Sequence, residues 1–456
     1  PRRWHPVHRP AKLKAMATRK SIHHILENSV LNDQTLLMVE RLNKADIVVG
    51  IPSYNNNNTI RHVVRAVQYG LAKYFPRHKA VLVNSDGGSE DGTREVVDQT
   101  GVYTDMETIL IQHQVKPAQK LVTPYHGIPG KGSAFHTIFE IAVRLRSRAC
   151  IVVDSDLRSI TPEWVELLAG PILTKDYDFV APYYSRHKYD GTITNSIIYP
   201  ATRALYGRRI RQPIGGDFGF SGRVAEHYLS RDIWGTNVAR FGIDIWMTTK
   251  AICEGYKICQ SFLGAKIHDA KDPGKSLGPM FTQVIGTMFQ LMGRYADRWK
   301  EIAGSKPTAL YGFLSEAYPA GVDVDLHGLL MKFREGYQKN REYMSGFLPP
   351  DRIRELDAAA AKPDDDFDFP ARTWVRLVWD YAVAFNRIPG EDLAASESLL
   401  LSMVPLYFGR TASFVRETAD IPSYDAEEVI ENLCDLFEEE KGYLRDRWKE
   451  AIPASE

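Results

Sequence analysis

Short apolar runs alternate with amphipathic stretches from Ala45 to about Gly278. The runs have the length and aliphatic composition of buried strands, whereas the stretches between them repeat apolar residues at helical spacing. The predicted strands lie near residues 46–51, 80–84, 108–112, 149–153 and 178–182, and the predicted helices lie near 59–73, 89–98, 132–146 and 162–169. This alternation predicts βαβ units, and therefore parallel strands in an α/β fold.

Within the α/β region, a helical segment at 244–254 precedes a strand-like pair near 257–268. The two ends of the chain have a different pattern, and residues 21–42 carry apolar positions at helical spacing. After Pro279 the predicted elements are amphipathic helices, at 281–295, 326–341, 374–386, 393–403 and 424–448. We therefore predict an N-terminal helical extension (1–44), an α/β domain (45–278, with a nucleotide-binding half 45–156 and an acceptor half 157–278) and a helical C-terminal region (279–456).

Composition narrows the class of protein. The 456 residues include 57 Lys plus Arg and 57 Asp plus Glu, so no bulk charge attracts nucleic acid or an anionic membrane. No run reaches the roughly 20 apolar residues of a membrane span, and the basic first residues lack the apolar core of a signal peptide. The four cysteines are scattered without a CxxC pair, which favours reduced thiols. We expect a cytoplasmic protein without a membrane span or a nucleic-acid partner.

Two carboxylates one residue apart, Asp154 and Asp156, follow the predicted strand 149–153. At the carboxyl edge of an α/β sheet they offer hard oxygen ligands where a nucleotide diphosphate and a divalent cation would meet. An Asp-x-Asp triplet is also common in solvated loops, so its position after a βαβ pattern is what favours the metal site.

The two preceding predicted strands end in polar loops at the same edge. Pro52, Tyr54 and Asn56 follow the first strand and could contact a nucleoside, although an Asn-rich turn with capping work explains the same residues. Ser85 and Asp86 follow the second strand, and a short carboxylate there can accept hydrogen bonds from a base or ribose.

A third loop, Gly130-Lys131-Gly132, precedes a predicted helix. Glycines allow close backbone approach, a helix N-terminus favours anions and Lys131 adds a positive charge, so a β-phosphate is the expected ligand. The spacing is not that of a Walker loop, and a plain glycine-rich helix start is the alternative.

Taken in order, these motifs and the later Gly215-Gly216-Asp217 and Asp244 resemble the glucosyl-3-phosphoglycerate synthase and mannosylglycerate-forming group of retaining glycosyltransferases, over about residues 45–275. The resemblance implies the A-type (GT-A) nucleotide-diphospho-sugar transferase fold. It also implies a Mg²⁺ or Mn²⁺ ion, with Asp156 and His268 as ligands and Asp154 in the metal shell.

The same resemblance assigns the remaining site residues. Asp244, Asp217 and Lys131 are implied as catalytic, although both aspartates could instead cap helices. The residues implied for the donor are Pro52, Tyr54, Asn56, Ser85, Asp86, Lys131, Asp154, Ser155, Gly215 and Gly216. Those implied for the acceptor are Gly191, Thr192, Thr194, Asn195 and Asp244.

The acceptor loop departs from the family pattern at Thr192, which stands where phosphoglycerate users carry an arginine. A neutral hydroxyl cannot form a bidentate contact with phosphate, so the sequence favours an unphosphorylated acceptor such as glycerate or a glycosylglycerate. The expected reaction is metal-dependent, retaining transfer of a hexose from a UDP- or GDP-sugar, as in the synthesis of glucosylglycerate-type compatible solutes.

Several alternatives stay open at this stage. They are a phosphoglycerate-using synthase, an inverting GT-A transferase with Asp244 as general base, and, less favoured, a sugar nucleotidyltransferase or a scaffold without catalysis. The apolar faces of the C-terminal helices, with aromatics such as Trp374 and Trp379, lead us to expect a homodimer.

Overall fold

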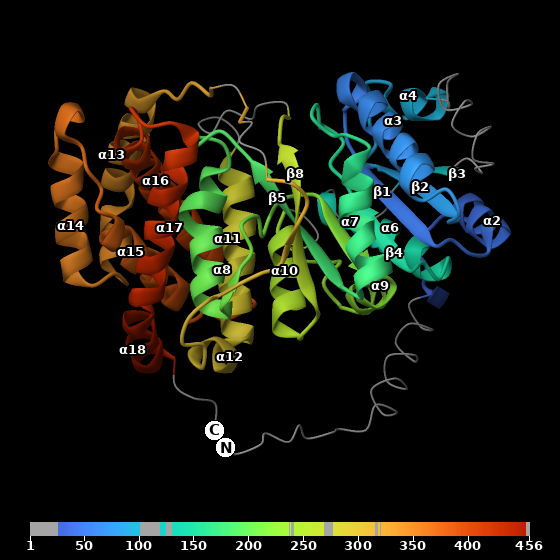
Figure 1. The fold of residues 1–456 in the computed structure, drawn as a ribbon. Helices are drawn as coiled ribbons and strands as arrows, with labels where there is room; N and C mark the ends of the chain where they lie inside the picture. Colours follow the sequence, from blue (N-terminus) through green and yellow to red (C-terminus); the bar gives the residue numbers. More distant parts are fainter. Residues whose placement is uncertain are drawn as a thin grey trace, which may run out of the picture.

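The computed structural model describes residues 26–100, 119–124, 130–236, 238, 241–268, 277–314, 318–319 and 321–452. Within these ranges, eight strands form one sheet in the order β10-β8-β5-β7-β4-β1-β2-β3 (Figure 1). The strands are β1 (Ile47–Ser53), β2 (Ala80–Asp86), β3 (Gln119–Pro124), β4 (Ala149–Val152), β5 (Phe179–Ser185), β7 (Phe218–Ser221), β8 (Ile258–Ala265) and β10 (Leu310–Tyr311). All neighbours are parallel except β7, which runs antiparallel to both β4 and β5.

Helices cover both faces of the sheet, and alternate side chains of β1 pack against them. Ile47, Val49 and Ile51 lie in one core cluster with residues of α3 (Asn57–Tyr74) and α7 (Glu163–Lys175). Val48 lies in the other cluster, together with residues of α6 (Lys131–Arg144). Successive residues of a strand point to opposite faces, so both faces of β1 are buried. The predicted α/β fold class is confirmed.

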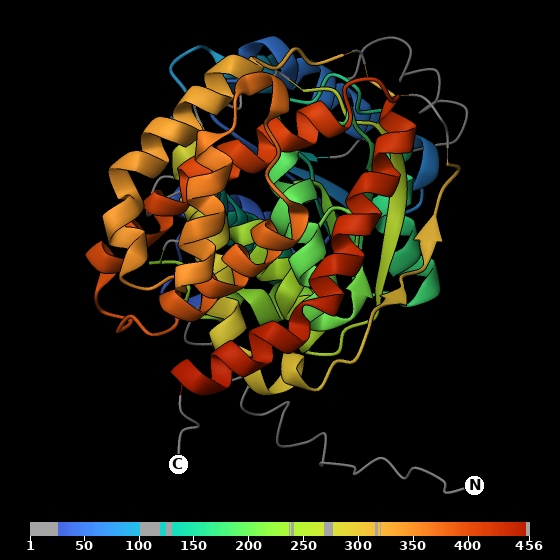
Figure 2. The same cartoon turned by 90° about the vertical axis from the view of Figure 1, so that its left-hand side faces the viewer.

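Further helices extend the second face of the sheet. Near the sheet on this face lie the π-helix η1 (Thr194–Ile198), α8 (Tyr199–Tyr206), α9 (Gly222–Leu229) and α10 (Ile243–Cys253), whereas α4 (Thr93–Gln99) packs beside α3 on the first face. Beyond them are α11 (Leu277–Arg294), α12 (Ala296–Lys300), α13 (Leu326–Ser345), α14 (Pro350–Ala361), α15 (Ala371–Phe385), α16 (Leu393–Glu417), α17 (Ser423–Glu439) and α18 (Lys441–Ala451). Figure 2 shows these C-terminal helices from their outer side. A helix near the N-terminus, α2 (Asp33–Leu42), completes the helical extensions that were predicted.

One hydrophobic core joins the sheet to the C-terminal helices. Val152 and Phe218 of the sheet belong to the same buried cluster as Trp374 of α15 and Tyr407 of α16. In addition, β10 lies beyond residue 278 and pairs with β8, while β6 (Arg208–Arg209) pairs with β9 (Lys306–Pro307). The division of the chain into three domains remains a prediction.

The structure corrects several predicted elements. The pair expected near 257–268 is the single strand β8, and the helix expected at 424–448 is divided into α17 and α18. Helix α16 continues past residue 403 and through Pro405, whose ring packs so closely on α13 that a Cβ atom at Gly336 would lie 2.3 Å from Pro405 Cγ. The strand expected at 108–112 lies outside the described residues. The short strand β7 and helices α8, α9 and α14 were not predicted.

Among the described residues, α16 alone has the length and composition of a membrane span, and 78% of its most apolar window is buried inside the protein. Its apolar surface is therefore accounted for by packing against neighbouring helices such as α13.

Candidate active site

The loops after β1 and β4 are tied together at the carboxyl edge of the sheet. Asn56 Oδ1 accepts hydrogen bonds from the backbone N–H of Tyr54, at 2.9 Å, and from Ser155 Oγ, at 2.8 Å. Thr59 Oγ1 donates to the carbonyl of Ser155 at 2.8 Å. The Tyr54 ring itself is 62% exposed. Asn56 and Ser155 therefore shape the loops, and Tyr54 offers an open aromatic face beside them.

Asp86, at the end of β2, is hydrogen-bonded by its own loop and by the end of β1. Its carboxylate accepts from the N–H groups of Gly88 and Ser89, at 3.0 and 2.9 Å, and from Ser53 Oγ at 2.9 Å. The side chains of Asp86 and Ser85 are buried, and the neighbouring Pro52 is partly buried. This arrangement fixes the turn after β2, and a direct contact between Asp86 and a nucleoside stays a prediction.

The carboxylate of Asp154 lies between two lysines. Lys131 Nζ, at the start of α6, is 2.7 Å from Oδ1, and Lys266 Nζ, just after β8, is 3.0 Å from Oδ2. Although burial opposes ionisation, the two ammonium groups hold the pKa of Asp154 well below its usual range. Lys266 was missed by sequence reasoning. The available signal was a basic residue within the strand-like pair predicted near 257–268, two positions before His268.

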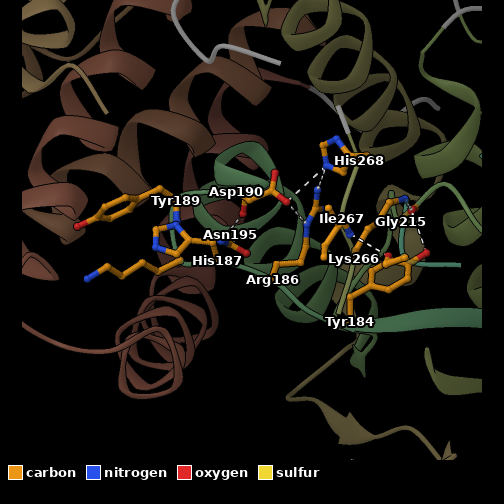
Figure 3. A network of polar contacts seen from close by, with 12 residues as sticks. Tyr184, Arg186, His187, Tyr189, Asp190, Asn195, Gly215, Lys266, Ile267 and His268 are labelled. Atoms are coloured by element: carbon orange, nitrogen blue, oxygen red, sulfur yellow. Dashed lines mark hydrogen bonds and ion pairs between the residues drawn. The ribbon is translucent and has the colours of Figure 1, made fainter. Parts of the chain in front are cut away.

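Asp217 lies beneath this ion-pair network, with none of its surface exposed (0%). Its carboxylate accepts from the backbone N–H of Asp154 at 2.8 Å, from Lys266 Nζ at 2.9 Å and from the hydroxyl of Tyr184. Figure 3 shows Tyr184 and Lys266 pointing toward one another beside Gly215. The geometry makes Asp217 a support for Asp154 and Lys266, and it places this carboxylate away from solvent.

Gly215 and Gly216 bring the backbone close to these side chains. Lys266 Nζ donates to the carbonyl of Gly215 at 2.8 Å. Gly216 has a φ of 90°, and a Cβ atom there would lie 2.0 Å from Oδ2 of Asp154. A Cβ at Gly215 would lie 2.3 Å from Pro182 Cγ. Both positions therefore require glycine.

Asp244, in the first turn of α10, has one carboxylate oxygen without a hydrogen-bond partner among the described residues. Its Oδ2 lies 3.4 Å from Lys131 Nζ, whereas its buried Oδ1 has no hydrogen-bond partner within the described ranges. Burial raises the pKa of Asp244, and Lys131 opposes that rise. An unsatisfied buried oxygen costs free energy, so this atom is suited to receive a hydroxyl donor from a ligand.

The loop after β4 and the segment after β8 meet beside Asp156. An isolated antiparallel bridge pairs Leu157 with His268, and the N–H of Arg158 donates to the carbonyl of Ile267 at 2.9 Å. This bridge places the backbone of His268 next to the residue that follows Asp156. Asp156 is partly buried, and no contact of its carboxylate is recorded in the part of the chain that the structure describes.

These residues fit a divalent cation only in part. Among the described residues, no group of three or more His, Cys, Asp or Glu side chains is placed to hold a metal ion. Both oxygens of Asp154 are occupied by lysines, so Asp154 does not fit as a ligand. Asp156 and His268 do fit, as one oxygen and one nitrogen donor, if ligand oxygens and water complete the coordination.

His268 also contacts the segment after β5. Its Nε2 lies 3.2 Å from Arg186 Nη2 and 3.5 Å from Asp190 Oδ2, and Arg186 Nε donates to Asp190 Oδ2 at 2.8 Å (Figure 3). Arg186 keeps 15% of its side chain exposed. Sequence reasoning overlooked this arginine, which lies four residues past the predicted strand 178–182, where no local pattern marks it.

The residues predicted for the acceptor lie against the C-terminal helices. Thr192 is 6% exposed and its hydroxyl is hydrogen-bonded to that of Tyr407. Asn195 is buried and accepts from Arg211 Nη2 at 2.9 Å, and Thr194 is buried in the same turn. Gly191 has a φ of 71° and lies beside Arg186, so that a Cβ there would be 2.9 Å from Arg186 Nη1. Their predicted role is therefore supported by the geometry only through Gly191.

Comparisons with known proteins identify the family of this chain. A family model described as "Mannosylglycerate synthase, GT domain" matches residues 51–288, which is more than half of the chain. Similar solved structures include glucosyl-3-phosphoglycerate synthase from Mycobacterium tuberculosis with Mn²⁺, UDP and phosphoglyceric acid (22% identity, 55% of this chain and 81% of that chain, TM-score 0.40). The same enzyme with Mg²⁺ and UDP also matches (22% identity, 55% and 82% covered, TM-score 0.40).

A search of curated proteins gave no match. The resemblance stated from the sequence is confirmed, and the chain belongs to the mannosylglycerate synthase glycosyltransferase-domain family and is a glycosyltransferase.

Proposed function

We propose that this glycosyltransferase moves a hexose from a nucleoside diphosphate sugar to a hydroxyl of a small, glycerate-type hydroxy acid. The observation that carries the proposal is that the loop after β4, which holds Asp154 and Asp156, contacts both Lys131 and the backbone of His268 at one edge of the sheet. Lys131 is held there by its contact with Asp154, and His268 by its bridge to Leu157. A cation and two metal-binding side chains at the ends of parallel strands suit a diphosphate.

The donor would lie across the loops that follow β1 and β4 and across the N-terminus of α6. Lys131 and the first N–H groups of α6 supply positive charge for the diphosphate, and the exposed ring of Tyr54 can stack on the base. A divalent cation held by Asp156 and His268 would, when bound, stabilise the negative charge of the departing diphosphate. Mg²⁺ and Mn²⁺ both accept such a donor set.

Asp244 is the residue best placed to orient a reacting hydroxyl. Its unpartnered Oδ1 can accept a hydrogen bond from the sugar or the acceptor, while Lys131 restrains Oδ2. We propose retention of configuration, with Asp244 in this orienting role. The same orphan oxygen favours a second candidate, inverting transfer with Asp244 as the general base. NMR assignment of the product's anomeric configuration separates the two.

Arg186 gives the acceptor a partner for its acidic group. Its guanidinium is partly exposed beside His268, and it can pair with a carboxylate or a phosphate. Because Thr192 is buried against Tyr407, the missing arginine at that position no longer argues against a phosphorylated acceptor. Glycerate, phosphoglycerate and a glycosylglycerate therefore all remain as candidate acceptors.

The experiment is a matrix of UDP- and GDP-hexoses against glycerate, phosphoglycerate and glucosylglycerate, with Mg²⁺, Mn²⁺ or EDTA. We expect transfer from one nucleotide series, restricted to acidic acceptors and abolished by EDTA. Transfer that persists in EDTA would refute the metal, and no transfer with any pair would refute the proposed reaction. The cytoplasmic location and the homodimer remain predictions, and the proposed reaction does not depend on them. Light scattering tests the dimer.

A further inference from the structure

The segment after β5, residues 186–190, connects two distant parts of the protein. At one side, Arg186 and Asp190 contact His268, as described above. At the other side, residues 188 and 189 contact the turn between α16 and α17, residues 418–422, and its flanks. We call residues 186–190 the acceptor segment. Figure 3 shows it running from Arg186 to Tyr189, with Asp190 facing His268.

Lys188 is the main link to the C-terminal helices. Its Nζ donates to the carbonyl of Thr418, to that of Ala419 at 3.3 Å and to that of Ile421 at 2.6 Å. Its backbone N–H donates to Ser423 Oγ at 3.2 Å. These carbonyls belong to the C-cap of α16 and the turn after it, near the negative end of the helix, so an ammonium group there is well bound.

Tyr189 adds a second link on the same side. Its hydroxyl donates to the carbonyl of Val415 at 3.2 Å, and its ring meets that of Phe414 edge to face, with centroids 6.3 Å apart. The acceptor segment is thus held from outside the sheet by residues near the end of α16. These residues lie beyond the region 51–288 that the family model matches.

We propose that Lys188 is a positioning residue for the acceptor, because it fixes the acceptor segment to the α16–α17 turn and so sets where Arg186 presents its guanidinium beside His268. This inference rests on the proposed function for its choice of substrate, a small anionic hydroxy acid. It assigns the C-terminal helices a part in acceptor recognition, and it leaves the donor side to residues that Lys188 does not contact.

The test compares Lys188→Met with the wild type in steady-state kinetics. Methionine keeps the length and apolar stem of the side chain and removes the charge. We expect the acceptor KM to rise roughly tenfold, because small misplacement of a binding group is costly. The nucleoside diphosphate affinity, measured by calorimetry with Mg²⁺, should change less than about twofold, since donor binding does not use Lys188.

Three further variants make the result specific. Lys188→Arg retains a cation and should restore much of the acceptor affinity. Ser423→Ala removes the hydroxyl to which the Lys188 backbone N–H donates. It should also raise the KM for the acceptor substrate. Lys73→Met removes an exposed ion pair with Glu163 on another helix and should leave both constants unchanged.

Amide hydrogen exchange gives a readout independent of turnover. Lys188→Met should speed exchange in the acceptor segment and leave β4 and α6 unchanged. If the wild type is active, two results for Lys188→Met would overturn the inference and leave the proposed function standing. One is an unchanged acceptor KM, and the other is a loss of donor affinity as large as the loss of acceptor affinity. A wild type without transfer overturns the proposed function, and unchanged exchange in Lys188→Met then overturns the inference as well.

Discussion

The backbones of Leu157 and His268 are joined by an isolated antiparallel bridge. This bridge brings the backbone of the histidine that follows β8 beside the loop that follows β4, so that the two proposed metal ligands, Asp156 and His268, come from separate parts of the sequence to one edge of the sheet. It is a backbone contact, so substitution of either side chain should leave it in place.

Asp156→Ala should therefore abolish metal-dependent transfer without unfolding the protein. The Asp156 carboxylate has no recorded partner among the described residues, so its loss should change the free energy of unfolding by less than about 0.5 kcal/mol. Transfer should fall by about 100-fold or more, because an electrostatic contribution to the leaving group is lost. Initial rates at varied Mn²⁺ and urea titrations measure the two effects. Asp297→Ala, at an exposed position of α12, is the matched control. Full activity in Asp156→Ala would remove the proposed metal site.

Gly216→Ala should damage both stability and activity. The added Cβ would lie 2.0 Å from Oδ2 of Asp154, at a φ of 90° that side chains rarely adopt. We expect a loss of about 1–3 kcal/mol in the free energy of unfolding and weaker donor binding, since Asp154 must leave Lys266. Gly442→Ala in α18, where a Cβ meets nothing within 4 Å, should be neutral. Equal behaviour of the two variants would contradict the close approach that the structure describes.

Tyr184→Phe should destabilise the support beneath Asp154. The variant removes a hydroxyl that donates to the buried carboxylate of Asp217, and a hydrogen bond to a charged group contributes about 1.5–3 kcal/mol. Urea unfolding should reveal this loss, and the optimum Mg²⁺ concentration should rise as the loop after β4 loosens. Tyr424→Phe, at a ring that is 62% exposed, is the control. A Tyr184→Phe protein as stable as the wild type would show that Asp217 does not depend on this hydroxyl.

Stability should fall in mild acid because of His136. Its ring stacks on Trp234 with centroids 4.4 Å apart, and burial lowers the pKa of His136 from 6.5 to about 4, against the opposing charge of Glu140. The unfolded chain therefore takes up a proton at a higher pH than the folded protein does. The stabilisation from the neutral ring is complete above pH 6.5 and is lost as the pH falls toward 4, by up to about 3 kcal/mol.

His136→Phe keeps an aromatic ring against Trp234 and removes the titrating group. The difference in unfolding free energy between pH 7 and pH 5 should shrink in this variant, as measured by urea titration at both values. His62→Phe, on the exposed face of α3, serves as the control and should keep the wild-type difference. A wild type equally stable at both pH values would contradict the role of His136.

The sequence allowed the donor edge of the site to be predicted, because parallel strands end at one edge and each strand end carries a recognisable motif. Asp154 was found in this way, Lys131 by the glycine-rich start of a predicted helix and Gly216 by the family resemblance, and the structure brings the three together. Lys266 and Tyr184 were not found, since their meeting with Asp217 depends on the insertion of β7 between β4 and β5. A four-residue antiparallel strand with a central glycine leaves little periodicity to detect.

The acceptor side was harder to predict for a different reason. Thr192 and Asn195 were assigned by their order in the chain, but the Thr192 hydroxyl is hydrogen-bonded to Tyr407, 215 residues later, and the Asn195 amide to Arg211. Contacts at that sequence separation leave no local pattern. Arg186, which faces His268, could be recognised only once the path of the chain after β5 was known.

The core shared by the sheet and the C-terminal helices limits how this enzyme can be shortened. A fragment cut at residue 288 would end inside α11 and would lose β10 from the sheet edge. It would also lose Tyr407, whose ring lies against that of Phe281 with centroids 5.0 Å apart, and Trp374, whose indole N–H donates to the carbonyl of Ser196 at 2.9 Å. Aromatic surface exposed by such a loss promotes aggregation. The C-terminal helices should therefore be kept together with the sheet whenever this transferase is expressed, grafted or evolved.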